Sequence, residues 1–142
     1  MDLPGCSIYL NKKSGDFVLE HEAISKEFGW TTSCGSLVHI SNSEMINKGI
    51  NVVLQSISEF FQREKLEKSE LEKLPIAQQK KFERAHKLLG LSLNRQDLLR
   101  LTPMHKGNRG GYISTPGEEI HVDLPCSNQE FYQKLMEAFS KC

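Results

Sequence analysis

Three short segments in the C-terminal half of the chain limit its possible folds more than any other feature, because apolar and polar residues alternate in each. Apolar side chains take every second position in residues 89–93, 99–102 and 120–124. Successive side chains of a strand point to opposite faces, so this alternation predicts strands with one buried face and one wet face. Such strands are typical of antiparallel or mixed sheets, because parallel sheets are usually covered on both faces.

Two helices are predicted from the residues at their first turns. Ser41 and Ser127 are each followed three positions later by a glutamate, Glu44 and Glu130, which is the capping-box pattern. The first helix is expected to run to Phe61 with apolar residues three and four apart, a wide stripe that faces a core. The second helix is expected to lie on the sheet through Phe131, Leu135, Met136 and Phe139.

The N-terminal part of the chain gives weaker signals. Ser7–Asn11 and Phe17–Glu20 flank a turn and predict a hairpin, and Ser36–Ile40 predicts another strand. Between them, residues 21–35 are expected to form a loop or a single helical turn. Gly49 lies inside the first predicted helix, where a glycine usually marks close packing against another element.

The middle of the chain combines a charged run with a proline. Arg63–Lys73 alternates glutamate and lysine, which predicts a solvated helical face. Pro75 suits the first turn of a further helix that runs to about Leu88, because proline is favoured at helix starts. Ile76, Phe82 and Ala85 would form the core face of that helix. Farther along, the glycine-rich stretch Lys106–Gly117 is expected to be a flexible loop.

Together these elements predict a fold of the α+β class. The length of 142 residues favours one domain that spans residues 1–142. We expect a mainly antiparallel sheet of about five to six strands packed against about three helices.

The sequence shows no residue pattern typical of a catalytic or metal site. The five histidines form neither an H-x-x-x-H nor an H-E-x-x-H pair, and the four cysteines form no C-x-x-C pair. The glycines match neither a P-loop nor a dinucleotide-binding pattern, so no cofactor is expected. Cys34 in its predicted loop leaves open a cysteine-dependent enzyme that uses a distant histidine. Our expectation is nevertheless a protein without enzymatic activity.

Charge and hydropathy argue against two classes of partner. The 18 basic and 18 acidic residues give a net charge of zero, whereas nucleic-acid binding depends on neutralising phosphates. No stretch approaches the ~20 apolar residues needed to cross a bilayer, and the N-terminus lacks the pattern of a signal peptide. The cysteines are interpreted as reduced thiols. We therefore expect a cytoplasmic protein that binds neither nucleic acid nor membrane.

Two segments are candidate sites for a protein partner. Residues 1–62 carry 4 basic and 7 acidic side chains, a net charge of −3, so their acidic residues could face a basic groove. The members of this acidic candidate, with an aromatic anchor, are Asp16, Glu20, Glu22, Glu27 and Trp30. The second candidate is Arg109 and Tyr112 in the glycine-rich stretch. That stretch could equally be a mobile turn or bind a small anion.

The order of several motifs resembles a known protein family. The motifs are an IS-x-x-EM helix start with a glycine one turn in (Ile40–Gly49), SISEFF (Ser56–Phe61), KFERAHK (Lys81–Lys87), P-x-H-x-G-x-R-G-G-Y (Pro103–Tyr112), I-x-V-x-L-P (Ile120–Pro125) and EFYQKLMEAF (Glu130–Phe139). In this order they resemble the immunity proteins of bacterial contact-dependent growth inhibition systems. The likeness covers residues 36–140, whereas residues 1–35 match no part of the family.

The resemblance implies a cytosolic protein without enzymatic activity. It would bind the C-terminal toxin domain of a contact-dependent inhibition effector, often a nuclease, and block the toxin's active site. Contact residues vary in such families, so none is carried over, and the neutral net charge departs from strongly acidic inhibitors that mimic nucleic acid. The main alternative is an adaptor or small-ligand-binding domain that uses residues 106–117. Strand order and oligomeric state are not predicted.

Overall fold

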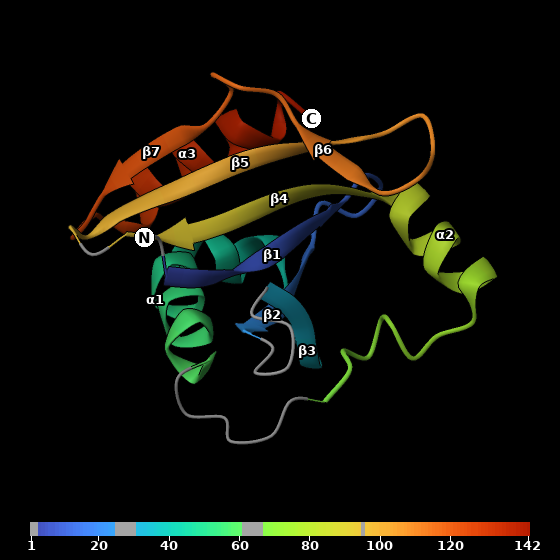
Figure 1. The fold of residues 1–142 in the computed structure, drawn as a ribbon. Helices are drawn as coiled ribbons and strands as arrows, with labels where there is room; N and C mark the ends of the chain where they lie inside the picture. Colours follow the sequence, from blue (N-terminus) through green and yellow to red (C-terminus); the bar gives the residue numbers. More distant parts are fainter. Residues whose placement is uncertain (1–2, 25–30, 61–66, 95) are drawn as a thin grey trace.

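The chain forms a seven-stranded antiparallel sheet with two helices on one face and a third helix at one end (Figure 1). The structure, a computed structural model, describes residues 3–24, 31–60, 67–94 and 96–142. The elements are β1 (Leu3–Asn11), β2 (Phe17–Ile24), β3 (Thr31–Ile40), α1 (Asn42–Phe60), α2 (Ile76–Ala85), β4 (His86–Leu93), β5 (Leu98–Lys106), β6 (Tyr112–Ser114), β7 (Ile120–Asp123) and α3 (Asn128–Phe139). The predicted α+β class, with a mainly antiparallel sheet and three helices, is therefore confirmed.

The sheet joins the two halves of the chain through its first strand. Its order is β3-β2-β1-β4-β5-β6, and β7 also pairs with β5. β1 pairs with β2 through a short turn and with β4 through a register that places Ile8 opposite Leu89. On its other side β5 pairs with β7 over its first half and with β6 over its last three residues. The C-terminal end of β5 therefore lies beside the β1–β2 turn and the end of α2 (Figure 1).

The main core lies between the sheet and the two helices α1 and α3. Both helices begin at the predicted serines: the Glu44 N–H donates to Ser41 Oγ over 3.2 Å, and the Glu130 N–H donates to Ser127 Oγ over 3.1 Å. A Cβ at Gly49 would lie 2.8 Å from Met45 Sδ of the same helix, whereas its distance of 3.6 Å to a ring carbon of Phe131 in α3 is an ordinary contact. The largest fully buried side chains of this core are Phe17, Phe131, Phe139, Ile8, Leu19, Met45, Leu89, Leu99, Leu101, Leu135, Val53 and Val122.

A second, smaller apolar cluster covers part of the opposite face of the sheet. It joins Tyr9 and Val18 of the sheet to Leu71, which lies in the segment before α2. The same segment is tied to β3, because the Gly35 N–H donates to the Glu67 carbonyl over 3.2 Å and the Glu70 N–H donates back over 3.0 Å. Part of the face that strand alternation would leave wet is therefore buried.

Two segment predictions before α2 were wrong. Residues 21–24 and 31–35 belong to β2 and β3 instead of a loop, because the pairing of these strands continues through Ala23 and Thr32, and residues 25–30 lie outside the described residues. In the described part of the charged run, residues 67–73 form a bridge and turns instead of a solvated helix. Tertiary packing decides this, since Ser69 is 0% exposed and Leu71 is 6% exposed.

Two further predictions need correction near the candidate site. α2 ends at Ala85 and buries none of its residues, so Ile76, at 70% exposure, and Ala85 do not form a core face. Phe82 does pack, against Tyr9, with ring centroids 5.0 Å apart. The stretch Lys106–Gly117 is not one flexible loop, because β6 pairs back on β5 as a hairpin. None of the described helices is long and apolar enough to cross a membrane.

Candidate functional site

The predicted acidic candidate does not form an exposed patch. Glu20 is 3% exposed, and its carboxylate accepts hydrogen bonds from Ser33 Oγ at 2.9 Å and Ser69 Oγ at 2.7 Å. Glu22 is half-buried and accepts a bond from Ser7 Oγ at 3.0 Å. Both lie on the face of the sheet that the segment before α2 partly covers. The alternation of polar and apolar residues in the strands does not predict that this face is covered.

The other acidic candidates are divided between two situations. Asp16 is exposed at the start of β2, where its carboxylate accepts the Asn42 N–H over 3.0 Å and so supports the start of α1. Glu27 and Trp30 lie outside the described residues. Burial raises the pKa of both Glu20 and Glu22 above the ordinary glutamate value, because the charged form loses water. Both carboxylates therefore make their hydrogen bonds within the protein, and neither is fully exposed to a partner.

Arg109 and Tyr112, the second candidate, lie on the β5–β6 hairpin. The turn is closed by hydrogen bonds from Gly107 N to Gly111 O at 3.0 Å and from Gly110 N to Gly107 O at 3.3 Å. Gly110 and Gly111 take φ values of +82° and +72°, which side chains other than glycine rarely adopt. Arg109 is exposed at this turn, whereas the half-buried Tyr112 points back toward the sheet.

A cavity of about 680 Å³, here called the basic cavity, opens beside this hairpin. Its walls come from the β1–β2 turn, the end of α2, the starts of β4 and β6, the end of β5 and the last residue of the sequence. The lining residues are Lys12, Glu83, Arg84, His86, Lys87, Leu88, Met104, His105, Lys106, Tyr112 and Cys142. Four of these side chains are cationic at neutral pH and one is a carboxylate, so the lining has an excess of positive charge.

The cations of the basic cavity are held by weak contacts. Lys12 Nζ donates to the Arg84 carbonyl over 3.0 Å at the C-terminal end of α2, where a positive charge is favoured. Lys106 Nζ lies 3.4 Å from Glu83 Oε2, and Lys87 Nζ donates to the Phe139 carbonyl over 3.4 Å. Each ammonium group has three N–H donors, so each of these lysines keeps donors for a further acceptor.

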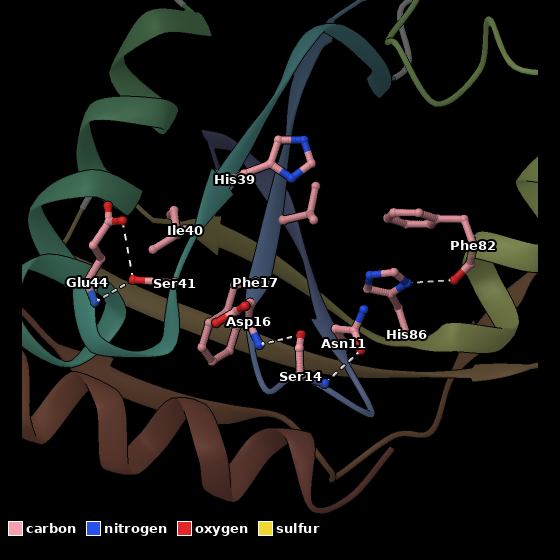
Figure 2. Close-up of a pocket in the computed structure, with 11 residues that line it drawn as sticks. Asn11, Ser14, Asp16, Phe17, His39, Ile40, Ser41, Glu44, Phe82 and His86 are labelled. Carbon is pink, nitrogen blue, oxygen red and sulfur yellow. Dashed lines mark hydrogen bonds between the residues drawn. The ribbon is translucent and has the colours of Figure 1, made fainter.

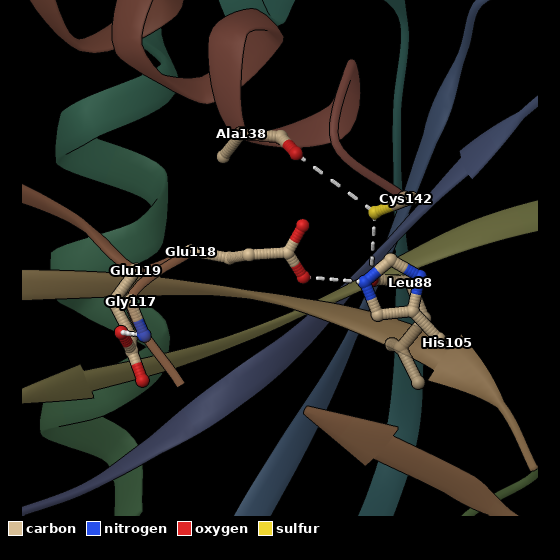
Figure 3. Close-up of polar contacts among 7 residues, drawn as sticks. All are labelled: Leu88, His105, Gly117, Glu118, Glu119, Ala138 and Cys142. Carbon is tan, nitrogen blue, oxygen red and sulfur yellow. Dashed lines mark hydrogen bonds and ion pairs between the residues drawn. The ribbon is translucent and has the colours of Figure 1, made fainter. Parts of the chain in front are cut away.

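The His105 end of the cavity is more tightly organised (Figure 3). His105 Nε2 lies 2.6 Å from Glu118 Oε1, and this hydrogen bond is the main reason that the pKa of Glu118 is lowered. Cys142 Sγ donates to the Leu88 carbonyl over 3.3 Å. Burial raises the pKa of the Cys142 thiol, so at neutral pH it is protonated and poorly suited to act as a nucleophile.

His86 also lines a second cavity, of about 540 Å³ (Figure 2). The ring stacks on Phe82, with centroids 3.9 Å apart, and its Nδ1 lies 2.7 Å from the Phe82 carbonyl oxygen. A carbonyl can only accept, so Nδ1 carries the proton and Nε2 is left for another partner. The second cavity also presents Asp16, Glu44 and His39, so its lining is more acidic than that of the basic cavity.

Sequence reasoning missed a buried Ser–His–Glu contact. His21 Nδ1 lies 2.7 Å from Ser56 Oγ, and His21 Nε2 lies 3.4 Å from Glu59 Oε2. Hydrolases use the same three groups with serine on Nε2 and the acid on Nδ1, whereas the two nitrogens are exchanged here, and Ser56 is 4% exposed and lines neither cavity. Cys34, the basis of the cysteine-enzyme alternative, is 1% exposed. Neither potential nucleophile is open to a substrate in this conformation. Among the described residues, no group of three or more histidine, cysteine or acidic side chains could hold a metal ion.

Comparison with solved structures gives a likeness of fold. A solved structure of a protein of unknown function, NMB0488 from Neisseria meningitidis, matches with a TM-score of 0.69 at 12% sequence identity. The match covers 100% of this chain and 96% of that chain. At this identity the likeness shows a shared fold. No protein-family model and no curated protein matches the sequence.

Proposed function

We propose that this chain is a non-catalytic, cytosolic immunity protein that binds and neutralises a toxin domain. The partner would be the C-terminal toxin domain of a contact-dependent inhibition effector, and binding would cover the toxin's active site. The proposal starts from the motif order in residues 36–140, which resembles that family. A second support is that two of those motifs lie together at the basic cavity.

The observation that carries the proposal is the convergence of two motifs on the basic cavity. KFERAHK supplies Glu83, Arg84, His86 and Lys87, and P-x-H-x-G-x-R-G-G-Y supplies Met104, His105, Lys106 and Tyr112. Arg84, Lys106 and Arg109 are exposed charges that contribute little to the core. Exposed charged residues that the fold brings together from separate segments are more typical of a binding surface than of residues that only stabilise the fold.

The charge of this surface favours one kind of contact on the toxin. Cationic side chains around a hollow are complementary to carboxylates, and Arg is a frequent anchor of protein interfaces. Carboxylates also hold the metal ions of many nuclease active sites. The proposed mode is therefore that acidic residues near the toxin's active site meet the rim of the basic cavity and Arg109.

Neutralisation of the toxin tests the proposal directly. The toxin domain encoded immediately upstream of this chain's gene is expressed with and without this protein, and growth is measured together with the dissociation constant of the purified pair. We expect rescue of growth and nanomolar or tighter binding. Absence of both rescue and binding, with folded protein, would discard the immunity proposal.

Paired variants test the surface. Replacing Arg84 and Arg109 with alanine should weaken toxin binding about tenfold or more, because Arg anchors often contribute more than 1 kcal/mol each. Lys48→Ala with Lys134→Ala removes the same charge from α1 and α3 and should leave binding nearly unchanged. Equal losses in both pairs would show that binding does not use this surface.

A further inference from the structure

The lining of the basic cavity carries more positively charged than negatively charged side chains. Lys12, Lys87 and Lys106 come from the β1–β2 turn, β4 and β5, and Arg84 adds a fourth cation from α2. Within the lining, Glu83 is the one carboxylate, and it already lies 3.4 Å from Lys106. Like charges brought together at a hollow repel one another unless an anion lies between them. The fold therefore favours an anionic occupant.

The donors and the shape of the cavity limit the occupant further. Within the described part of the chain, Lys12 and Lys87 each donate one hydrogen bond, to the main-chain carbonyls of Arg84 and Phe139, and an ammonium group has three N–H donors. The volume of about 680 Å³ lies within the range of roughly 300–1,000 Å³ typical of small-molecule sites, and it is too large for a bare inorganic anion alone. Leu88 and Met104 add an apolar part to the wall.

We propose that the basic cavity binds a small phosphorylated organic molecule. Its phosphate lies beside Lys12 and Lys87, which keep N–H donors for an acceptor, and Lys106 and Arg84 add positive charge to the same lining. Its uncharged body lies against Leu88 and Met104. This binding is a separate property of the chain, which requires no toxin partner and does not depend on the proposed immunity function.

The test uses ribose 5-phosphate as the probe and ribose as its neutral counterpart. Titration is followed calorimetrically at low salt and by NMR of methyl-labelled methionines. Met104 lines the cavity, whereas Met45 is fully buried beneath the opposite face of the sheet, so the two methyl groups report different places. We expect saturable binding of ribose 5-phosphate with a shift at Met104 and none at Met45, weaker binding of inorganic phosphate and no binding of ribose.

Two pairs of variants locate the site. Lys12→Gln with Lys87→Gln should weaken ribose 5-phosphate binding about tenfold or more, since charge-assisted hydrogen bonds are lost. Lys48→Gln with Lys134→Gln makes the same change of net charge on α1 and α3, outside the lining, and should change the affinity less than twofold.

Several outcomes would overturn the inference. No binding of ribose 5-phosphate at millimolar concentration would remove it, and so would an equal loss in the two variant pairs, which would indicate a general effect of charge. Equal affinities for ribose 5-phosphate and inorganic phosphate would reject the organic ligand. Toxin binding without binding of the sugar phosphate would leave the immunity proposal standing and reject this one.

Discussion

At the scale of single residues, the most unusual feature is the pair of carboxylates on β2, of which Glu20 is buried and Glu22 half-buried. Glu20 is held by hydrogen bonds from the hydroxyls of Ser33 and Ser69. Burial is the largest cause of the raised pKa of Glu20, so the folded protein binds a proton more readily than the unfolded chain does. The stabilising effect of this group is therefore complete below the unfolded pKa and is lost as pH rises through the folded pKa.

Replacing Glu20 with glutamine should raise the free energy of unfolding at pH 8 and flatten its pH dependence. The amide has nearly the same shape and stays neutral, and the serine hydroxyls can rotate to suit it. Urea unfolding between pH 4.5 and 8 measures the effect, with exposed Glu70→Gln as the control. If Glu20→Gln and the unmodified protein show the same change of stability with pH, the buried carboxylate is not the cause.

The hydroxyl of Tyr112 gives a second prediction at this scale. Its oxygen is buried and has no hydrogen-bond partner among the described residues, and burial, aided by Glu83, raises its pKa to about 12. Tyr112→Phe should therefore change the free energy of unfolding by less than about 1 kcal/mol, or stabilise the protein, because an unsatisfied buried group is removed.

Tyr132 provides the matched comparison for Tyr112. Its hydroxyl donates to Asn42 Oδ1 over 2.8 Å, so Tyr132→Phe should cost about 1 kcal/mol. Thermal or urea unfolding of the two variants at neutral pH makes the comparison. A larger loss for Tyr112→Phe than for Tyr132→Phe would mean that the Tyr112 hydroxyl has a partner after all.

At the scale of elements, the contact between β1 and β4 depends on a glycine. β1 has an irregular register between Leu3 and Cys6, and a Cβ at Gly5 would overlap the main-chain carbonyl of Leu91. Main-chain atoms of a central strand cannot move aside cheaply, so the two strands approach this closely only with glycine there.

Gly5→Ala should lower the free energy of unfolding by about 2 kcal/mol or more, as expected for an overlap with no room to relax. Gly90→Ala is the control on the neighbouring strand, since nothing lies within 4 Å of a Cβ built there. We expect Gly90→Ala to change stability by less than about 1 kcal/mol. Chemical denaturation of both variants checks this, and a similar small effect for each would contradict the close approach.

Comparison of the elements with the sequence shows which local patterns were sufficient to predict structure. The caps at Ser41 and Ser127 and the alternating strands were predictable, because a local pattern alone determines them. The segment from Glu67 to Lys73 was not predictable in the same way. Its charges read as a solvated helix, whereas the burial of Ser69 and Leu71 depends on Glu20 and the opposite face of the sheet, which lie far away in sequence.

At the scale of the whole molecule, the fold class was predictable and the candidate site only in part. Arg109 and Tyr112 were expected near a binding surface, but the cavity beside them needs Lys12 and Lys87, which only the pairing of β1 with β4 brings together. The predicted acidic residues do not all lie at the surface, because Glu20 is buried beneath the segment that contains Ser69, and no local pattern in the sequence indicates that cover. A site whose residues are brought together by the order of the strands cannot be predicted from one sequence while that order is unknown.

The position of β1 in the middle of the sheet has a consequence for how the chain reaches its native state. β1 obtains one neighbour from its own hairpin, but its other neighbour, β4, begins only at His86. Long-range pairings of this kind slow folding, because loop closure costs entropy before the contact forms. Until β4 has been synthesised, one side of β1 remains an unpaired sheet edge that can pair with another chain. The nascent chain is therefore most exposed to aggregation during the synthesis of the residues between α1 and β4.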